Sequence, residues 1–495
     1  MKFDTQKYSY PSRRTVSFAK NGMVATSSPL PAQVGLDVLK KGGNAIDAAV
    51  ATAAALSVIE PTSNGIGADS FALIWYKGKL YGLNGSGHSP RLISGEKLLE
   101  QGLKAVPNDG WDPVMVPGTP SAWAEAVKKF GNLPLSEVLE PAAKYAEEGY
   151  PLAPNIGKQW QLGYKRFMKA GGPEKFEGWF ETFAPDGKML GDGDVFRCQA
   201  MADTLREIGA TNAESFYRGE LAKKMADYSE KPGGWLRLED FQDYRAEFVE
   251  PITTNYHGYD VYEMPPNGHG ITVLMALNIL KGFDLGNNRE SVDVYHKTIE
   301  AMKLAFVDGK EYVADPKAMQ TKVADMLSDE YAAERRKLIT DTAVMPEPGT
   351  PFSGGTVYLC TADKEGNMVS WIQSNYMGFG SGIVVPGTGI SFNNRGANFS
   401  LDPTKDNYLE PGKKAYHTII PGFLCKDGQA VGPFGVMGGF MQPQGHLQVL
   451  LNTIDEVEIM NDTYSMGRGE IIWRWDDEVL VGASEPRCDG HVASW

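Results

Sequence analysis

The sequence predicts one large domain in which helices cover β-sheets. Amphipathic helices dominate the first 340 residues, and short strands are scattered between them. After residue 353 the pattern changes to the apolar/polar alternation of strands joined by tight turns. No low-complexity linker and no short-period repeat separates the two parts, so we expect them to interlock in one structural domain.

In the first part, the strongest signal is the alanine-rich stretch at 45–59. Asn44 is a favourable N-cap for it, and Pro61 lies just beyond its end. A bilayer span needs about 20 apolar residues. This stretch is shorter and contains Asp47, so it predicts a buried helix. The other elements expected here are a strand at 23–27, a helix at 31–42, a hairpin at 71–85, two helices within 120–150, mostly helical structure at 196–249, a strand that begins at 259 and ends on a double proline, and a long helix at 290–313.

The second part predicts strand pairs. The run at 356–376 alternates around a turn at 365–367, which is typical of a β-hairpin. The same strand-turn-strand form is expected at 389–394, 422–436 and 470–483, and one helix near 442–454.

Composition and charge exclude several classes of function. The 495 residues include 48 basic and 62 acidic side chains, which gives a net charge of -14. Such a chain has no broad basic face for phosphate backbones, so we expect no nucleic-acid partner. The four cysteines are far apart and form no CxxC pair, which argues against a disulfide framework and a zinc knuckle. The N-terminus has no apolar signal segment, so we expect a cytoplasmic protein that makes no membrane contact.

Motifs for nucleotides and metals are missing from the sequence. It contains no GxxxxGK[ST], HExxH or GxSxG sequence and no complete GxGxxG after a strand. The histidines have no ligand-like spacing. We therefore expect no cofactor and no metal, and a nucleotide-dependent α/β enzyme is rejected for want of a phosphate loop.

Two short stretches contain groups of the kind that catalysis uses. In GVMGGFMQPQGH, Gly438 and Gly439 follow a strand and precede a helix, where backbone N–H groups can face a charged or polarised group; the alternative is a tight turn. In SGGTVYLC, Thr356 lies at the start of a strand. It is either an ordinary strand residue or a nucleophile that becomes a new N-terminus when the chain cuts itself.

Several long segments together resemble the signature stretches of the γ-glutamyltranspeptidase family, and they occur in the family's order from about residue 20 to the end. They are GMVATSSPLPAQVGLDVLKKGGNAIDAAVATAAALSVIEPTSNGIG, VPGTPSAWAEAVKKFGNLPLSEVLEPAAKYAEEGY, MPPNGHG, HKTIEAMKLAFVDGKEYVADP, GNMVSWIQSNYMGFGSGIVVPGTGISFNN and GASEPRCDG. The resemblance implies an α+β fold, the four-layer αββα sandwich of the N-terminal-nucleophile (Ntn) hydrolases. It also implies an inactive precursor that splits into a large and a small subunit.

Aligned on the shared GN at 366–367, Thr356 falls on the residue that begins the family's small subunit. The resemblance therefore implies cleavage between Gly355 and Thr356 into regions 1–355 and 356–495, which stay together as a heterodimer; further dimerisation of this heterodimer stays open. A threonine hydroxyl is a weak nucleophile, but the freed α-amino group, with a pKa of about 7.7–8.0, is a suitable base on the same residue.

The resemblance also assigns supporting roles. The N–H groups of Gly438 and Gly439 would hold the oxyanion of the reacting amide. Ser374 takes the place of a second threonine that supports the nucleophile. For Asn375 and Tyr376, which follow it into a glycine-rich loop, a role in the pocket and a role in the scaffold both stay open.

At the positions that hold a γ-glutamyl group, the chain departs from the family. Ser86 stands where the transpeptidases have an arginine for the α-carboxylate, and Arg91 is the one arginine nearby in the sequence. Asn398 stands where they have an acid for the α-amine, while Arg395 adds a positive charge in the same segment.

His417 and Thr418 take the place of the family's paired serines near the oxyanion hole, an arrangement that resembles the divergent branch with cephalosporin-type acylases and small-amide hydrolases. A carboxylate-bearing acyl group could be met by Arg395, His417 or Arg91. The expected function is transfer of an acyl group from a small amide, a γ-glutamyl compound such as glutathione or a related donor, to water or an amine. The alternatives are an acylase or amide hydrolase without γ-glutamyl specificity, and a non-catalytic binding protein on the same fold.

Overall fold

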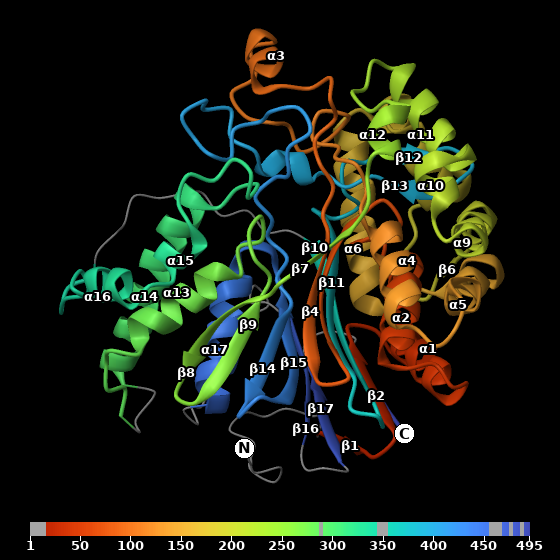
Figure 1. Ribbon diagram of the computed structural model, residues 1–495. Coiled ribbons are helices and arrows are strands. Elements are labelled where there is room, and N and C mark those ends of the chain that lie inside the picture. The colour runs from red at the N-terminus through yellow and green to blue at the C-terminus, as the bar shows by residue number, and fades with distance from the viewer. Residues whose placement is uncertain (1–15, 287–290, 344–354, 455–467, 475–478, 486–489) are drawn as a thin grey trace.

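The computed structural model describes residues 16–286, 291–343, 355–454, 468–474, 479–485 and 490–495. Two seven-stranded antiparallel sheets lie face to face at the centre of the molecule, and helices cover both outer faces (Figure 1). This four-layer arrangement confirms the α+β, αββα fold that the sequence predicts.

The first sheet is built around the hairpin that begins at Gly355. Its strands are, in spatial order, β18 (His491–Ser494), β2 (Gly22–Thr26), β10 (Gly355–Asp363), β11 (Met368–Tyr376), β3 (Asp69–Tyr76), β4 (Lys79–Gly85) and β7 (Glu247–Val249). Leu359 of β10 lies opposite Thr26 on one side and Trp371 on the other. The strand that contains Thr356 is therefore a central strand, held on both sides.

The second sheet likewise mixes strands from distant parts of the chain. Its order is β1 (Ser17–Ala19), β17 (Leu480–Ser484), β16 (Arg468–Arg474), β15 (Gln429–Met437), β14 (Gly422–Lys426), β9 (Tyr259–Glu263) and β8 (Ile252–Tyr256). Both sheets thus join strands that precede Gly355 to strands that follow it.

Helices from the first part cover the outer face of the first sheet (Figure 1). Those that pack directly on its strands are α1 (Pro29–Lys40), α2 (Ala45–Ile59) and α4 (Thr119–Phe130). Further out or around them lie α5 (Leu135–Glu148), α6 (Pro154–Lys169), α7 (Gly172–Lys175), α8 (Glu177–Phe183), α9 (Gln199–Thr211), α10 (Glu214–Arg218), α11 (Glu220–Glu230) and α12 (Leu238–Gln242).

The second sheet is covered by α13 (Ile271–Leu280) and α17 (Gln442–Ile454), with α14 (Val292–Tyr312) packed on α13. The remaining elements are α3 (Gly95–Glu100), α15 (Val323–Met326), α16 (Asp329–Arg336), the 3-10 turns η1 (Pro185–Gly187), η2 (Arg395–Asn398) and η3 (Gly439–Met441), and the two-residue pairs β5/β6 (Tyr150–Pro151, Val195–Phe196) and β12/β13 (Val384–Val385, Ile390–Ser391). Within the described ranges, no helix is long and apolar enough to cross a bilayer.

Helix α2 confirms the prediction made for the alanine-rich stretch. The Asn44 side chain accepts the N–H groups of Ile46 and Asp47, and Asp47 in turn accepts the N–H of Asn44, which is a capping box. Every residue of α2 is buried, because its small side chains let it pack between the first sheet and the neighbouring helices. The hairpin turns at Lys77 and at 365–367 and the helices α14 and α17 are confirmed as well.

One predicted strand pair is largely wrong. Of the stretch at 389–394, only Ile390 and Ser391 form a strand, paired with β12. The asparagine that follows bonds elsewhere, since both the N–H and the side-chain amide of Asn393 donate to the carbonyl of Gly67. These contacts tie the segment before η2 to the loop before β3.

Candidate active site

Thr356 lies at an irregularity of the central hairpin. Gly355 is in register with Tyr376, but Val357 is in register with Gln373, so β11 has one extra residue and bulges opposite Thr356. The Thr356 hydroxyl is buried and donates to the Ser374 hydroxyl at 3.2 Å, and the Ser374 oxygen also accepts the N–H of Tyr376 at 2.8 Å. The bulge thus turns the Thr356 hydroxyl toward a second buried hydroxyl on β11. Ser353 and Gly354, which precede it, lie outside the described residues.

The glycine pair follows the end of β15. Gly438 has φ 148° and Gly439 has φ 65°, values that favour glycine, and the chain then enters η3 and α17. Three residues before Gly438, a Cβ on Gly435 would meet the ring of Tyr358 at 2.2 Å. The two sheets are therefore in close contact two residues from Thr356 and three residues from Gly438.

A loop from the first part positions His417 and Thr418. The N–H of His417 donates to the carbonyl of Asn267, and the N–H of His269 donates to the carbonyl of His417. The His269 ring lies 2.9 Å from the Thr418 carbonyl oxygen and 3.0 Å from the Tyr416 hydroxyl. The MPPNGHG stretch, residues 264–270, thus holds this segment in place through backbone hydrogen bonds.

Asp69, His417, Arg395 and Thr418 form one buried polar cluster. Asp69 Oδ2 lies 3.1 Å from His417 Nε2 and 3.4 Å from Arg395 Nε, and Arg395 Nη1 donates to the Thr418 hydroxyl at 2.8 Å. His417 Nδ1 accepts the N–H of Ile419, so the ring proton is on Nε2 and is donated to Asp69. The cluster therefore contains a carboxylate, a guanidinium and an imidazole.

Burial shifts both basic groups of this cluster. Burial, and next the charge of Arg395, lower the pKa of His417 to about 4, so the ring is neutral at pH 7. Burial also lowers the pKa of the Arg395 guanidinium, against the opposing effect of Asp69. A guanidinium stays charged under any ordinary condition, so Arg395 brings a permanent positive charge into the interior.

The cluster is adjacent to the Thr356–Ser374 pair. Asp69 is the register partner of Ser374 across β3 and β11. The Arg395 guanidinium lies over the ring of Tyr376, 4.8 Å from its centroid, and Tyr376 is the register partner of Gly355. Two strand pairings therefore connect the charged cluster to the nucleophile candidate.

Asn375 and Asn398 have less complete hydrogen bonding. Asn375 Nδ2 donates to the carbonyl of Asn64 at 2.9 Å. Asn375 Oδ1 and Asn398 Nδ2 are both buried and have no hydrogen-bond partner among the described residues. Asn398 lies at the end of η2, the turn that begins at Arg395.

Ser86 and Arg91 have other partners. The Ser86 hydroxyl donates to Asn84 Oδ1 at 2.7 Å and accepts Asn267 Nδ2 at 3.2 Å, so it joins the end of β4 to the loop that positions His417. The Arg91 side chain is 49% exposed and pairs with Asp243 and Asp240 at α12. The structure thus brings Ser86 near the cluster, while Arg91 is engaged in a surface ion pair.

Sequence reasoning missed Asp69, Asn267 and His269. The signal for Asp69 was its place between the glycine-rich loop SNGIGA and the apolar strand FALIWY. An acid at the start of a buried strand is unusual unless it is paired. Asn267 and His269 lie in a motif that pairs with residues about 150 positions away, so its structural role is not visible from the local sequence.

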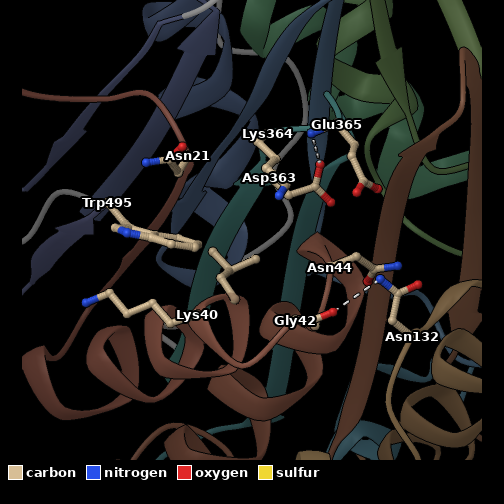
Figure 2. A pocket seen from close by; sticks show the side chains of 11 residues that line it. Asn21, Lys40, Gly42, Asn44, Asn132, Asp363, Lys364, Glu365 and Trp495 are labelled. Carbon is tan, nitrogen blue, oxygen red and sulfur yellow. Dashed lines mark hydrogen bonds between the residues drawn. The ribbon is translucent and has the colours of Figure 1, made fainter.

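A pocket elsewhere on the molecule has no part in this cluster (Figure 2). It lies between the ends of α1 and α2 and the β10/β11 turn, and it is lined by Asn21, Leu39, Lys40, Gly42, Gly43, Asn44, Asn132, Asp363, Lys364, Glu365 and Trp495. None of the candidate site residues lines it. Over the described part of the chain, no group of three or more His, Cys, Asp or Glu side chains is arranged to hold a metal.

Comparisons with known proteins show which family the chain resembles. The sequence profile described as Gamma-glutamyltranspeptidase matches residues 31–468. The chain is 35% identical over 439 residues to the glutathione hydrolase-like YwrD proenzyme of Bacillus subtilis, covering 88% of this chain and 82% of that one. It is 32% identical over 479 residues to the oxamate amidohydrolase proenzyme of Klebsiella pneumoniae, covering 94% and 89%.

Among solved structures, a cephalosporin acylase from Bacillus halodurans superposes with a TM-score of 0.94. The two chains are 55% identical, and the match covers 100% of this chain and 99% of that one.

Proposed function

Because the chain belongs to the gamma-glutamyltranspeptidase family and is a hydrolase of the Ntn type, we propose that Thr356 is its nucleophile and that it acts on small amides. The observation that carries this proposal is the hydrogen bond from the Thr356 hydroxyl, near the start of β10, to Ser374 at the bulge of β11. A hydroxyl on the second residue of a central strand becomes an N-terminal nucleophile once the bond before it is cut.

Maturation would proceed by attack of Thr356 Oγ on the carbonyl carbon of Gly355. The carbon–nitrogen bond breaks, the Oγ proton passes to the departing nitrogen, and an ester links Gly355 to Thr356 Oγ. Water then hydrolyses the ester, which leaves a carboxylate on Gly355 and a free α-amino group on Thr356. Because strands from both fragments share both sheets, the fragments remain one folded unit.

In the mature enzyme, the α-amino group of Thr356 takes the Oγ proton as Oγ attacks a substrate amide. The N–H groups of Gly438 and Gly439 stabilise the oxyanion, since they lie between a strand end and the start of α17. The carbon–nitrogen bond breaks, the amine leaves with the proton, and the acyl group is transferred from Oγ to water or to another amine.

The names of the relatives support an amide substrate and a precursor. Both relatives are called proenzymes, and their names contain glutathione and oxamate. Each of these compounds is an amide that also carries a carboxylate. Transfer of a γ-glutamyl group and hydrolysis of a related acyl amide are both within this chemistry. Thr356, Ser374, Gly438 and Gly439 serve either substrate in the same way.

Self-cleavage tests the proposal directly. The purified protein should give two bands of about 39 and 15 kDa, scaled by residue count from 54.1 kDa, and the smaller should begin at Thr356. Thr356→Ala should stay a single folded chain without amidase activity, whereas Thr356→Ser keeps a hydroxyl and should still be cut. Cleavage of Thr356→Ala at the same bond would refute the mechanism, and an uncut wild-type chain would favour a non-catalytic binding protein on this fold.

A further inference from the structure

Strands β14 and β15 part just before the glycine pair. Their antiparallel register ends where Gly422 lies opposite Phe434. Continued by two residues in the same register, the ladder would set Ile420 opposite Val436. Instead, side chains of α17 accept the N–H groups of both residues, and we call the place where the strands part the fork. The fork lies two residues before Gly438, so it immediately precedes the proposed oxyanion turn.

Two side chains of α17, about one helical turn apart, supply the acceptors at the fork. Gln442 Oε1 accepts the N–H of Ile420 at 3.0 Å, and His446 Nε2 accepts the N–H of Val436 at 3.3 Å. Residues four apart lie on the same face of a helix, so a single face of α17 serves both strands. Both side chains are fully buried. A buried N–H without an acceptor is costly, so these bonds replace those that a continued ladder would make.

Glu263 fixes which ring nitrogen of His446 can accept. Glu263 Oε1 lies 2.7 Å from His446 Nδ1, and both side chains are fully buried. Because Nε2 accepts the N–H of Val436, the ring proton is on Nδ1 and is donated to Glu263. In the other tautomer, the proton on Nε2 would face the N–H of Val436, and two donors would repel each other. The carboxyl group of Glu263 therefore supports the fork through the imidazole.

The segment between the fork and α17 is packed closely but keeps its glycine N–H groups unpaired. A Cβ on Gly445 of α17 would meet the Val436 side chain at 2.8 Å, so the helix and β15 approach each other more closely than another residue would allow. Neither Gly438 nor Gly439 donates its N–H to another residue in the described part of the chain. Two N–H groups without an internal acceptor are what an oxyanion site requires.

We propose that Gln442, His446 and Glu263 are positioning residues for the reaction. They hold the fork open, so that the N–H groups of Gly438 and Gly439 face the oxyanion instead of pairing within the sheet. This proposal rests on the oxyanion role proposed above for the two glycines. Glycine has wide conformational freedom, so the orientation of such a turn must be imposed by its neighbours. The three side chains act through the backbone and need no contact with the substrate.

Gln442→Met tests one side of the fork. Gln442 Nε2 has no hydrogen-bond partner among the described residues, so a methionine of similar length removes the bond to Ile420 and no other. The processed enzyme is assayed with γ-glutamyl- and glutaryl-p-nitroanilide, and the anilide that the wild type hydrolyses faster is used. The kcat should fall about 10- to 100-fold, the effect of a small misplacement of a transition-state donor. KM should change by less than about 3-fold, because the oxyanion contacts are made chiefly in the transition state.

His446→Leu and His446→Gln test the other side of the fork. Leucine removes both hydrogen bonds of the ring and should lower kcat by a similar factor. Glutamine offers an amide oxygen to the N–H of Val436 and an amide N–H to Glu263, so it should restore most of the lost kcat. If His446 only filled the core, the order would be reversed, because leucine is the better apolar filler.

Thr254→Val is the matched control. The Thr254 hydroxyl donates to Asn278 and accepts from Lys281, which joins β8 of the same sheet to the end of α13. The substitution should lower the melting temperature about as much as Gln442→Met does and leave kcat unchanged. An equal fall of kcat in Thr254→Val would show that any loosening of this sheet slows the reaction, and the proposal would be overturned. Wild-type kcat in both Gln442→Met and His446→Leu would overturn it as well.

Hydrogen exchange keeps this proposal distinct from the catalytic one. It is measured by mass spectrometry on peptides that cover 417–424 and 434–441 in the uncut Thr356→Ala chain. Both peptides should exchange faster when Gln442→Met or His446→Leu is added than when Thr254→Val is added, because the fork loses acceptors. If the wild type is neither cut nor active but exchange responds in this way, the role of Thr356 fails and the fork stands. If the wild type is active and exchange does not respond, the fork is refuted.

Discussion

The pairs Asp69–His417 and Glu263–His446 have the same chemistry in different surroundings. Both are buried, with nitrogen–oxygen distances of 3.1 and 2.7 Å, and in each the other ring nitrogen accepts a backbone N–H, from Ile419 in the first pair and from Val436 in the second. Only Asp69 also faces an arginine. Both imidazoles are therefore fixed as one tautomer, but a permanent charge is present at one pair alone.

This difference shows whether a buried ionisable group without a full set of hydrogen bonds can become neutral. Glu263 Oε2 has no hydrogen-bond partner in the described structure, and burial raises the pKa of Glu263, so a proton can neutralise it. Arg395 has no such route, because a guanidinium keeps its proton, and its Nη2 has no hydrogen-bond partner among the described residues. The pair at β9 and α17 thus links sheet and helix and can lose its charge, whereas the pair at β3 retains the charge of Arg395.

The largest effect should come from removing one charge at each pair. In the Thr356→Ala background, where unfolding involves one chain, Asp69→Asn should lower the free energy of unfolding by about 3–5 kcal/mol, because it leaves Arg395 buried without a counter-charge. Glu263→Gln should cost roughly 1–2 kcal/mol, since its amide still accepts from His446 and only a neutral N–H is left unpaired. Urea unfolding at pH 7 measures both, and equal losses would contradict the distinction.

The next effect is a dependence of stability on pH. The pKa of His417 is about 4 in the folded protein, against about 6.5 when unfolded. Below pH 6.5 the unfolded chain binds a proton that the folded one does not, so stability is lost as the pH falls toward 4, by roughly 3 kcal/mol in all from this group. Asp69 favours the proton, while Arg395 and Lys414 oppose it.

The variant His417→Gln tests this assignment. It should flatten the fall in unfolding free energy between pH 6.5 and 4.5 while leaving the contribution of His269, whose pKa burial lowers to about 3, in place. An unchanged slope in His417→Gln would show that other groups carry the pH dependence.

The secondary structure around this site was easier to predict from the sequence than the contacts between its charged side chains. The hairpins at 71–85, 356–376 and 422–436, the capped helix α2 and the strand at Thr356 follow from local periodicity and turn residues, and the structure has them where they were expected. The strand pair predicted at 389–394 is the exception. The four-layer sandwich required the family resemblance, because periodicity alone does not say which sheet a strand joins.

Long-range partners explain what remained hidden. Asp69 meets Arg395 and His417, which follow it by more than 300 positions, so no local pattern relates them. Arg91 was an expected carboxylate partner because it lies near Ser86 in the sequence, yet Asp243 and Asp240 engage it at the surface. Separation along the chain therefore did not indicate which residues are neighbours at the site. The bulge opposite Thr356 and the turn η2 are local backbone features that position the site residues.

The smallest effect distinguishes two hydroxyl pairs on the same two strands. Thr356 donates to Ser374 at 3.2 Å, and four residues back along β11, Ser370 lies 2.8 Å from the Tyr358 hydroxyl. Ser374→Ala should slow self-cleavage and amide hydrolysis by about 10- to 100-fold, as expected when one transition-state hydrogen bond of roughly 1.5–3 kcal/mol is lost. Ser374→Thr keeps the hydroxyl and should remain close to wild type.

Ser370→Ala is the matched control for that loss. It removes a buried hydroxyl from the same strand and leaves the Tyr358 hydroxyl without this partner, so it should lower stability by about 1–3 kcal/mol. Rates of self-cleavage and hydrolysis should not change, because Tyr358 faces Gly435 of the opposite sheet. If Ser370→Ala slowed self-cleavage as much as Ser374→Ala, the effect at Ser374 would be general loosening of the hairpin, and the bond from Thr356 to Ser374 would have no specific part in catalysis.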